Sequence, residues 1–154
     1  MMYNLMRRLR GMALAGALLG SIAAPVVAAA PAQAAAQTAY VQYYLTDGLG
    51  NVKYHVVFYG TVYPEGPYHY RIVGDFSSYC GPGALTAQSV RLDWRESGGY
   101  WSDRRFWCDN YGEHIDTYGS RSYGNNVDLT VGATSGVFNT YEYSSVHTFQ
   151  IGVD

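Results

Sequence analysis

Apolar and polar residues alternate at every second position along much of the chain, and this period predicts β-strands. The clearest case is Val52–Tyr63, where Val52, Tyr54, Val56 and Phe58 are separated by single, mostly polar residues. No stretch after residue 36 sustains the 3.6-residue period of an amphipathic helix. The expected strands are Tyr40–Thr46, Val52–Tyr63, Tyr68–Phe76, Thr86–Glu96, Tyr100–Cys108, Asn126–Val131, Val137–Tyr143 and Val146–Val153.

Turn-forming residues separate these strands, as in Asp47–Asn51, Pro64–Pro67 and Ser97–Gly99. Two longer segments, Ser77–Leu85 and Asp109–Asn125, are expected to be loops. About eight short strands at this spacing predict an all-β fold, an antiparallel β-sandwich of two sheets. A small β-barrel is the alternative. The sandwich is favoured because alternating strands have one wet face and one buried face.

Residues 1–36 have the pattern of a secretory signal peptide. Arg7, Arg8 and Arg10 precede the uncharged run Gly11–Ala24, and small residues surround an expected cleavage near Ala36. A retained membrane anchor is the alternative, but the apolar run is short for a span and rich in alanine. We therefore expect one secreted, extracellular domain formed by residues 37–154.

Cleavage at this position would change the net charge from −2 to −5, because 7 basic and 12 acidic residues follow residue 36. A negative net charge repels phosphate backbones and anionic lipid surfaces. We therefore expect no nucleic-acid partner and no membrane partner for the mature chain, and we expect it to be a monomer.

The chain has 2 cysteines, Cys80 and Cys108. In an oxidising compartment a Cys80–Cys108 disulfide is the expected state. Closing a loop of this length stabilises a fold by roughly 3–4 kcal/mol when the effect is treated as lost entropy of the unfolded chain. A reactive thiol is the alternative, but the sequence has no Cys-x-x-Cys and no histidine beside either cysteine.

Aromatic residues are abundant after residue 36, and they are concentrated between Tyr100 and Tyr111. This segment follows a hairpin turn whose length decides which side chains face the core. A two-residue Gly98–Gly99 turn places Arg105 opposite Leu92, whereas a three-residue turn places Arg104 there. In either register an arginine points toward the expected core, and a bulge, an edge position or an exposed face must resolve the conflict.

Two interpretations of this aromatic segment are open. In the first, exposed aromatic and cationic side chains form a ligand-binding platform, because Trp, Tyr and Arg carry most binding energy at interfaces. In the second, the tryptophans are core residues beside the disulfide and Asp93 pairs with Arg104. The small size of the domain favours the second. The candidate ligand-binding residues are Trp101, Trp107, Arg104, Arg105, Tyr100 and Tyr111.

Several residues with oxygen-bearing side chains follow Cys108 closely in the sequence and suggest a weak calcium site. The candidate ligands are Asp109, Asn110, Glu113 and Asp116. Their spacing does not match an EF-hand loop, and acidic loops are usually solvated. We expect no other cofactor.

The sequence favours binding over catalysis. It has no Gly-x-Ser-x-Gly motif, and Gly132–Gly136 has different spacing. We expect a small secreted binding protein that recognises extracellular carbohydrate or cell-wall material through an aromatic-rich face. One alternative is a protein-directed inhibitor or toxin-like factor that presents loops held by the disulfide. Another is a small extracellular hydrolase.

Overall fold

The structure is a computed structural model that describes residues 35–82, 89–108, 111–122, 126–135 and 140–152. The expected signal peptide therefore lies almost wholly outside the described residues. Among the described residues, no helix is long and apolar enough to cross a membrane.

Strands are the regular elements of the described residues. They are β1 (Gln37–Thr46), β2 (Val52–Pro64), β3 (His69–Cys80), β4 (Ser89–Glu96), β5 (Ser102–Trp107), β6 (Tyr111–Ser120), β7 (Val127–Ser135), β8 (Thr140–Tyr143) and β9 (His147–Phe149).

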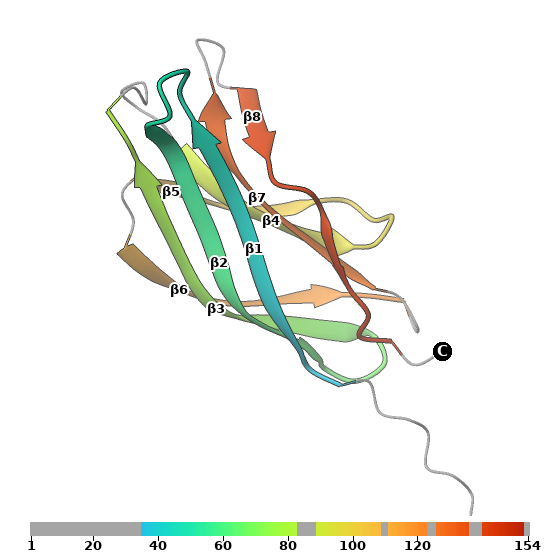
Figure 1. Cartoon of the computed structure of the whole chain (residues 1–154). Coiled ribbons are helices and arrows are strands. Elements are labelled where there is room, and N and C mark those ends of the chain that lie inside the picture. Colours follow the sequence, from blue (N-terminus) through green and yellow to red (C-terminus); the bar gives the residue numbers. More distant parts are fainter. Residues whose placement is uncertain (1–34, 83–88, 109–110, 123–125, 136–139, 153–154) are drawn as a thin grey trace, which may run out of the picture. The chain divides into compact units, whose positions relative to one another are not determined.

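These strands make two antiparallel sheets that pack face to face, which confirms the predicted β-sandwich (Figure 1). One sheet has four strands in the order β1-β2-β3-β6. The other has five strands, with the order β5-β4-β7-β8 and with β9 also paired to β7. β8 pairs with Gly132–Ser135 and β9 with Val127–Leu129, so two short strands share one side of β7.

β6 was not predicted, because the segment that contains it was expected to be a loop. Its fully buried apolar residue is Ile115, so its alternation is weak. Gly119 looks like a loop residue in the sequence, but here it makes room for an aromatic ring. A Cβ atom on Gly119 would lie 2.0 Å from Cζ of Tyr70 on β3.

β3 is also longer than predicted. It continues through Ser77–Cys80, so the expected loop Ser77–Leu85 is wrong for these four residues. Ser78 is buried on the inner face of the sheet, where the sequence pattern calls for an apolar residue. At the other end of the chain, β9 is shorter than the predicted strand Val146–Val153.

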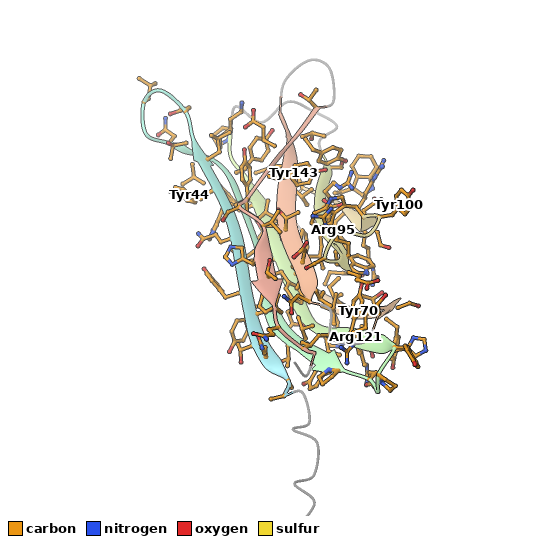
Figure 2. All side chains as sticks on the ribbon, turned by 90° about the vertical axis from the view of Figure 1, so that its right-hand side faces the viewer. Tyr44, Tyr70, Arg95, Tyr100, Arg121 and Tyr143 are labelled. Atoms are coloured by element: carbon orange, nitrogen blue, oxygen red, sulfur yellow. A yellow bond between two sulfur atoms is a disulfide. The ribbon has the colours of Figure 1, made fainter. Side chains whose placement is uncertain are left out.

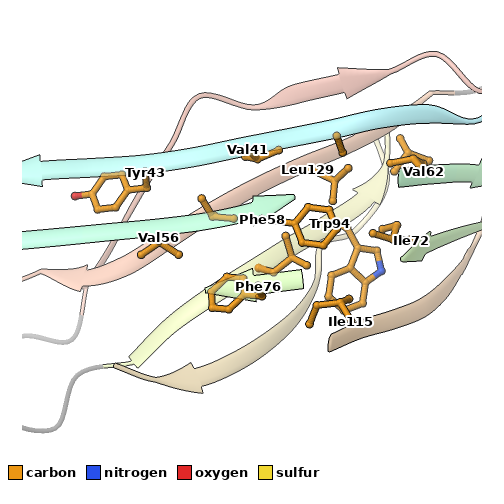
Figure 3. Close-up of a cluster of buried hydrophobic side chains, with 14 of the residues drawn as sticks. Val41, Tyr43, Val56, Phe58, Val62, Ile72, Phe76, Trp94, Ile115 and Leu129 are labelled. Carbon is orange, nitrogen blue, oxygen red and sulfur yellow. The ribbon is translucent and has the colours of Figure 1, made fainter. Parts of the chain in front are cut away.

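The core lies between the sheets and is built from the alternate residues of each strand (Figure 3). Trp94 of β4 is buried there among Phe58, Ile72 and Ile115. Gly60 of β2 and Gly74 of β3 lie side by side and leave a gap between the strands, and the ring of Phe58 covers it. A Cβ atom on Gly74 would lie 2.5 Å from Cα of Gly60 and 2.9 Å from Cζ of Phe58.

The two sheets are tied together where β3 approaches β5. The predicted disulfide is present and joins Cys80 at the end of β3 to Cys108, which follows β5. Beside it the rings of Phe76 and Phe106 stack with centroids 4.4 Å apart. These contacts fix the edge strand β5 to the opposite sheet.

The β4–β5 pairing has the register expected for a three-residue Ser97–Gly99 turn, with Arg104 opposite Leu92. Arg104 avoids the core because β5 is an edge strand, and its Nη2 atom lies 3.1 Å from Oε1 of Glu113 on β6. The same register places Asp93 opposite Asp103. The expected Asp93–Arg104 ion pair is therefore wrong.

Candidate functional site

The outward face of the five-stranded sheet carries charged, hydroxyl and aromatic side chains, and we call it the polar face. Strand alternation places these side chains, because their neighbours along each strand are on the inner side of the sheet. Arg95 and Trp101 add a cation–π contact at the end next to the β4–β5 turn, with 4.3 Å between Cζ of Arg95 and the ring centroid. The polar face consists of Ser89, Arg91, Asp93 and Arg95 of β4, Trp101, Asp103, Arg105 and Trp107 in or beside β5, Thr130 and Thr134 of β7, and Tyr141 and Tyr143 of β8.

Four charges lie at the centre of the polar face. Arg91 is opposite Arg105, and Asp93 is opposite Asp103, so like charges face each other across the two strands. Such pairs are unfavourable by themselves. Ion pairs along each strand offset them: Nε of Arg91 is 2.8 Å from both oxygens of Asp93, and Nε of Arg105 is 3.0 Å from Oδ2 of Asp103.

Asp93 is only 2% exposed although it lies on an outward face. Burial raises the pKa of Asp93, and the facing carboxylate of Asp103 acts in the same direction, whereas Arg91 opposes both. Burial lowers the pKa of Arg91, but its hydrogen bond to Asp93 and the charges of Asp93 and Asp103 together outweigh burial and keep the pKa above its ordinary value. Arg91 and Asp93 are thus a fixed pair in the floor of the face.

Two tyrosines of β8 flank this pair. Cζ of Arg91 lies 4.7 Å from the ring centroid of Tyr141 and 5.6 Å from that of Tyr143. Gly132 of β7 lies between Arg91 and Tyr143 in the register, and its missing side chain leaves room for the ring of Tyr143. A Cβ atom on Gly132 would lie 2.6 Å from Cδ1 of Tyr143.

A cavity of about 650 Å³ opens at one end of the polar face, and we call it the Trp107 pocket. Trp107 is 73% exposed beside it. The hydroxyl groups of Ser89 and Tyr141 are hydrogen-bonded to each other in its lining. The described lining residues are Ser89, Arg91, Arg105, Phe106, Trp107, Thr134 and Tyr141.

A smaller cavity of about 230 Å³ lies farther along the same face, and we call it the Trp101 pocket. Arg91 lines both pockets, so the two cavities are neighbours across its side chain. Oγ1 of Thr130 is 2.9 Å from Oγ of Ser144 in this region. The described lining residues are Arg91, Asp93, Trp101, Thr130, Tyr143, Ser144 and Val146.

The structure brings three of the six predicted binding residues together on the polar face: Trp101, Trp107 and Arg105. Trp101 is 39% exposed, so the interpretation that placed both this residue and Trp107 in the core is wrong. The other three lie elsewhere. Arg104 points to Glu113, Tyr100 is fully exposed in the turn region, and Tyr111 lies on the outer side of the other sheet.

Sequence reasoning missed the residues that complete the site. Asp93 was expected only as an ion-pair partner of Arg104, and Arg91, Tyr141 and Tyr143 were not among the candidate site residues. A usable signal was present, because Arg91, Asp93 and Arg95 are charged rather than small and polar at three successive outward positions. Tyr141 and Tyr143 repeat the same spacing on β8.

The expected calcium ligands are only partly described. Asp109 and Asn110 lie outside the described residues. Glu113 and Asp116 point to opposite sides of β6, the first toward Arg104 and the second toward Arg71, whose Nε atom is 2.7 Å from Oδ1 of Asp116. In the part of the chain that the structure describes, no three His, Cys, Asp or Glu side chains form a metal-binding group.

The outward face of the four-stranded sheet is rich in exposed tyrosines. Tyr44, on this side, and Tyr100, beside the polar face, lie on opposite sides of the molecule (Figure 2). The tyrosine rings contact one another and their neighbours, as Tyr40 and Tyr59 do with centroids 6.5 Å apart. The exposed tyrosines here are Tyr40, Tyr44, Tyr59, Tyr63, Tyr79, Tyr111 and Tyr118.

No protein-family model, curated protein or solved structure matches this chain. The case for a function therefore depends on the chemistry of the polar face.

Proposed function

We propose that this protein binds carbohydrate on its polar face, outside the cell. The observation that carries the proposal is the exposed indole of Trp107 beside a pocket lined by Arg105, Tyr141 and hydroxyl groups. A sugar ring has an apolar face of C–H groups, which packs on an aromatic ring, and a rim of hydroxyl groups, which need donors and acceptors. Binding sites in general combine such aromatic surface with a few well-placed polar groups.

The positions of the polar groups suit this role because they are set before a ligand arrives. The pocket side chains stand on strands rather than on loops. Arg91 is held by Asp93 and flanked by Tyr141 and Tyr143. Ordering that is complete in the unbound protein lowers the entropic penalty of binding.

The Cys80–Cys108 disulfide supports an extracellular location, because disulfides persist in oxidising compartments. We further propose that residues 1–36 are the secretory signal peptide, on the sequence pattern given above.

The test is retention of the purified protein on a panel of insoluble and soluble polysaccharides, followed by calorimetric titration with fragments of those that bind. We expect Trp107→Ala to weaken binding by roughly tenfold to a hundredfold, because a central aromatic anchor contributes on the order of 2 kcal/mol. Tyr100→Ala is the matched control, since it removes a fully exposed aromatic ring outside both pockets.

Two results would overturn the proposal. One is an absence of retention on every polymer of the panel. The other is an equal loss of binding in the Trp107→Ala and Tyr100→Ala variants, which would show that the polar face is not the binding surface.

One observation favours a second candidate, a glycoside hydrolase. Asp93 and Asp103 face each other, and burial raises the pKa of Asp93, as in a general acid. However, both oxygens of Asp93 accept hydrogen bonds from Arg91, and the residue is almost completely buried. Binding without cleavage is therefore the better-supported function, and release of reducing ends from a bound polymer would decide for hydrolysis.

The protein-directed alternative loses part of its expected surface. It relied on loops at Ser77–Leu85 and Asp109–Asn125, but Ser77–Cys80 belongs to β3 and Tyr111–Ser120 forms β6.

A further inference from the structure

The two pockets of the polar face differ in charge. The Trp107 pocket is lined by Arg91 and Arg105, and none of its described lining residues is acidic. The Trp101 pocket is lined by Arg91 together with Asp93, which balance each other. The difference follows from the register of β4 and β5, which places both arginines in one row and both aspartates in the next.

The two arginines of the Trp107 pocket are not equivalent. Arg91 is mostly buried, and its Nε and one terminal nitrogen donate hydrogen bonds to Asp93. The side chain of Arg105 is 62% exposed, and its hydrogen bond to a described residue, Asp103, uses Nε alone. The terminal nitrogens of Arg105 are therefore the donors that a ligand in this pocket would meet.

A guanidinium group with exposed terminal N–H donors matches a carboxylate in shape and charge. Arg91 and Arg105 are each paired with an aspartate, but the terminal donors of Arg105 still face the pocket. A neutral sugar can use these donors only through its hydroxyl groups, whereas a carboxylate accepts from them in a charge-assisted hydrogen bond. The expected mature net charge of −5 gives a polyanion no attraction at long range. Selection for an anion must therefore come from direct contact inside the pocket.

We propose that the Trp107 pocket binds a uronic acid residue of an acidic polysaccharide, with Arg105 contacting the carboxylate and Trp107 packing on the ring. This inference rests on the proposed carbohydrate-binding function and names its ligand class. The neighbouring Trp101 pocket, which has no net charge, takes an uncharged part of the same polymer.

The experiment compares ligands that differ only in the carboxylate. The probes are oligomers of galacturonate, mannuronate–guluronate and glucuronate–N-acetylglucosamine, each paired with its fully methyl-esterified form, and neutral cellulose, xylan and mannan oligomers complete the panel. We expect at least one acid form to bind roughly tenfold more tightly than its ester, which corresponds to about 1.4 kcal/mol. Dextran sulfate, whose anion is not planar, is expected to bind more weakly than that acid form.

Two variants test whether Arg105 is the residue that recognises the carboxylate. Arg105→Gln replaces the charged guanidinium by a shorter, neutral polar side chain, so it is expected to abolish the preference for the acid over its ester. Arg71→Gln on the opposite sheet is the matched control and is expected to retain the preference. Thermal unfolding of both variants checks that the fold persists.

The outcomes separate this inference from the proposed function. Binding of neutral or esterified oligomers as tightly as acids, or an unchanged preference in Arg105→Gln, overturns the inference and leaves carbohydrate binding standing. Equal or tighter binding of dextran sulfate overturns the assignment of a carboxylate. Failure of every oligomer to bind overturns the proposed function as well.

Discussion

Tyr43 and Tyr54 are buried tyrosines of β1 and β2 whose hydroxyl groups have different surroundings. The hydroxyl of Tyr43 donates to Oε2 of Glu142 on β8 at 2.8 Å and so bridges the two sheets. No described residue lies within hydrogen-bond distance of the hydroxyl of Tyr54, which is fully buried. A buried polar group without a partner loses its hydration and gains nothing in return.

This contrast gives a prediction for two matched substitutions. Tyr54→Phe is expected to leave the free energy of unfolding unchanged or to raise it by up to about 1 kcal/mol, because it removes an unsatisfied hydroxyl. Tyr43→Phe is expected to lower it by about 1 kcal/mol, because it removes a hydrogen bond. Urea denaturation of both variants measures the difference, and a larger loss in Tyr54→Phe than in Tyr43→Phe would contradict it.

Single glycines decide where aromatic rings can lie, and the sequence does not show this. Gly119 makes room for Tyr70, Gly74 for Phe58 and Gly132 for Tyr143, and each ring comes from a different strand than its glycine. A glycine in a sequence is correctly taken as a sign of a turn or an interruption. Whether a glycine instead makes room for an aromatic ring depends on which strand pairs with it, and the local pattern of apolar and polar residues does not encode strand pairing.

At the scale of strands, Asp128 of β7 links three other parts of its sheet. Its carboxylate accepts hydrogen bonds from Ser97 in the hairpin turn at 2.7 Å, from Thr148 of β9 at 2.8 Å and from Arg95 of β4 at 3.0 Å. Burial by itself raises the pKa of Asp128, but these hydrogen bonds outweigh burial and hold the pKa below its ordinary value. The ionised carboxylate is therefore the form that the folded state favours.

A pH-dependent loss of stability is expected on this basis. Because the pKa of Asp128 is lower in the folded state than in the unfolded state, its contribution is complete above the ordinary carboxyl range and is lost as the pH falls through the folded value. Asp128→Asn is expected to lower the free energy of unfolding at pH 7 by about 1.5–3 kcal/mol. The difference from the parent protein is expected to narrow below about pH 4.

Chemical denaturation at pH 7 and at acidic pH measures this effect. Asp75→Asn on the opposite sheet is the control, since this carboxylate is well exposed and its substitution is expected to change the free energy of unfolding by less than about 0.5 kcal/mol. An Asp128→Asn penalty that stays constant with pH would contradict the assignment.

The strands themselves were largely predictable from sequence, and the candidate site was only partly so. Strong alternation in β2 and β4 gave their positions and inward faces, and two cysteines in a chain of this type gave the disulfide. β6 was not predicted because its outward tyrosines and its glycines weaken the alternation of apolar and polar residues. The polar face was predicted only in part, because its tyrosines on β8 lie next to Arg91 only when β7 is placed between β4 and β8. The order of strands in a sheet is not a local property of the sequence.

At the scale of the whole domain, the Cys80–Cys108 bond joins the four-stranded sheet to the edge of the five-stranded sheet. Replacing both cysteines by serine is expected to lower the free energy of unfolding by about 3–4 kcal/mol, because the unfolded chain regains the freedom of a long loop. Denaturation of the oxidised parent, the reduced parent and the double variant measures this. The reduced parent should match the variant, and a loss below about 1 kcal/mol would indicate a compact unfolded state instead.

The break between β8 and β9 affects whether copies of this protein can associate through the edge of this sheet. A long, straight edge strand offers a template on which a strand of another copy can add, and this route leads to aggregation. On this side of β7 the edge consists of strands of 4 and 3 residues. Ser144 is tied back between them by a backbone hydrogen bond to Val131. An incoming strand finds no continuous ladder there, so this side of the protein resists strand addition by another copy.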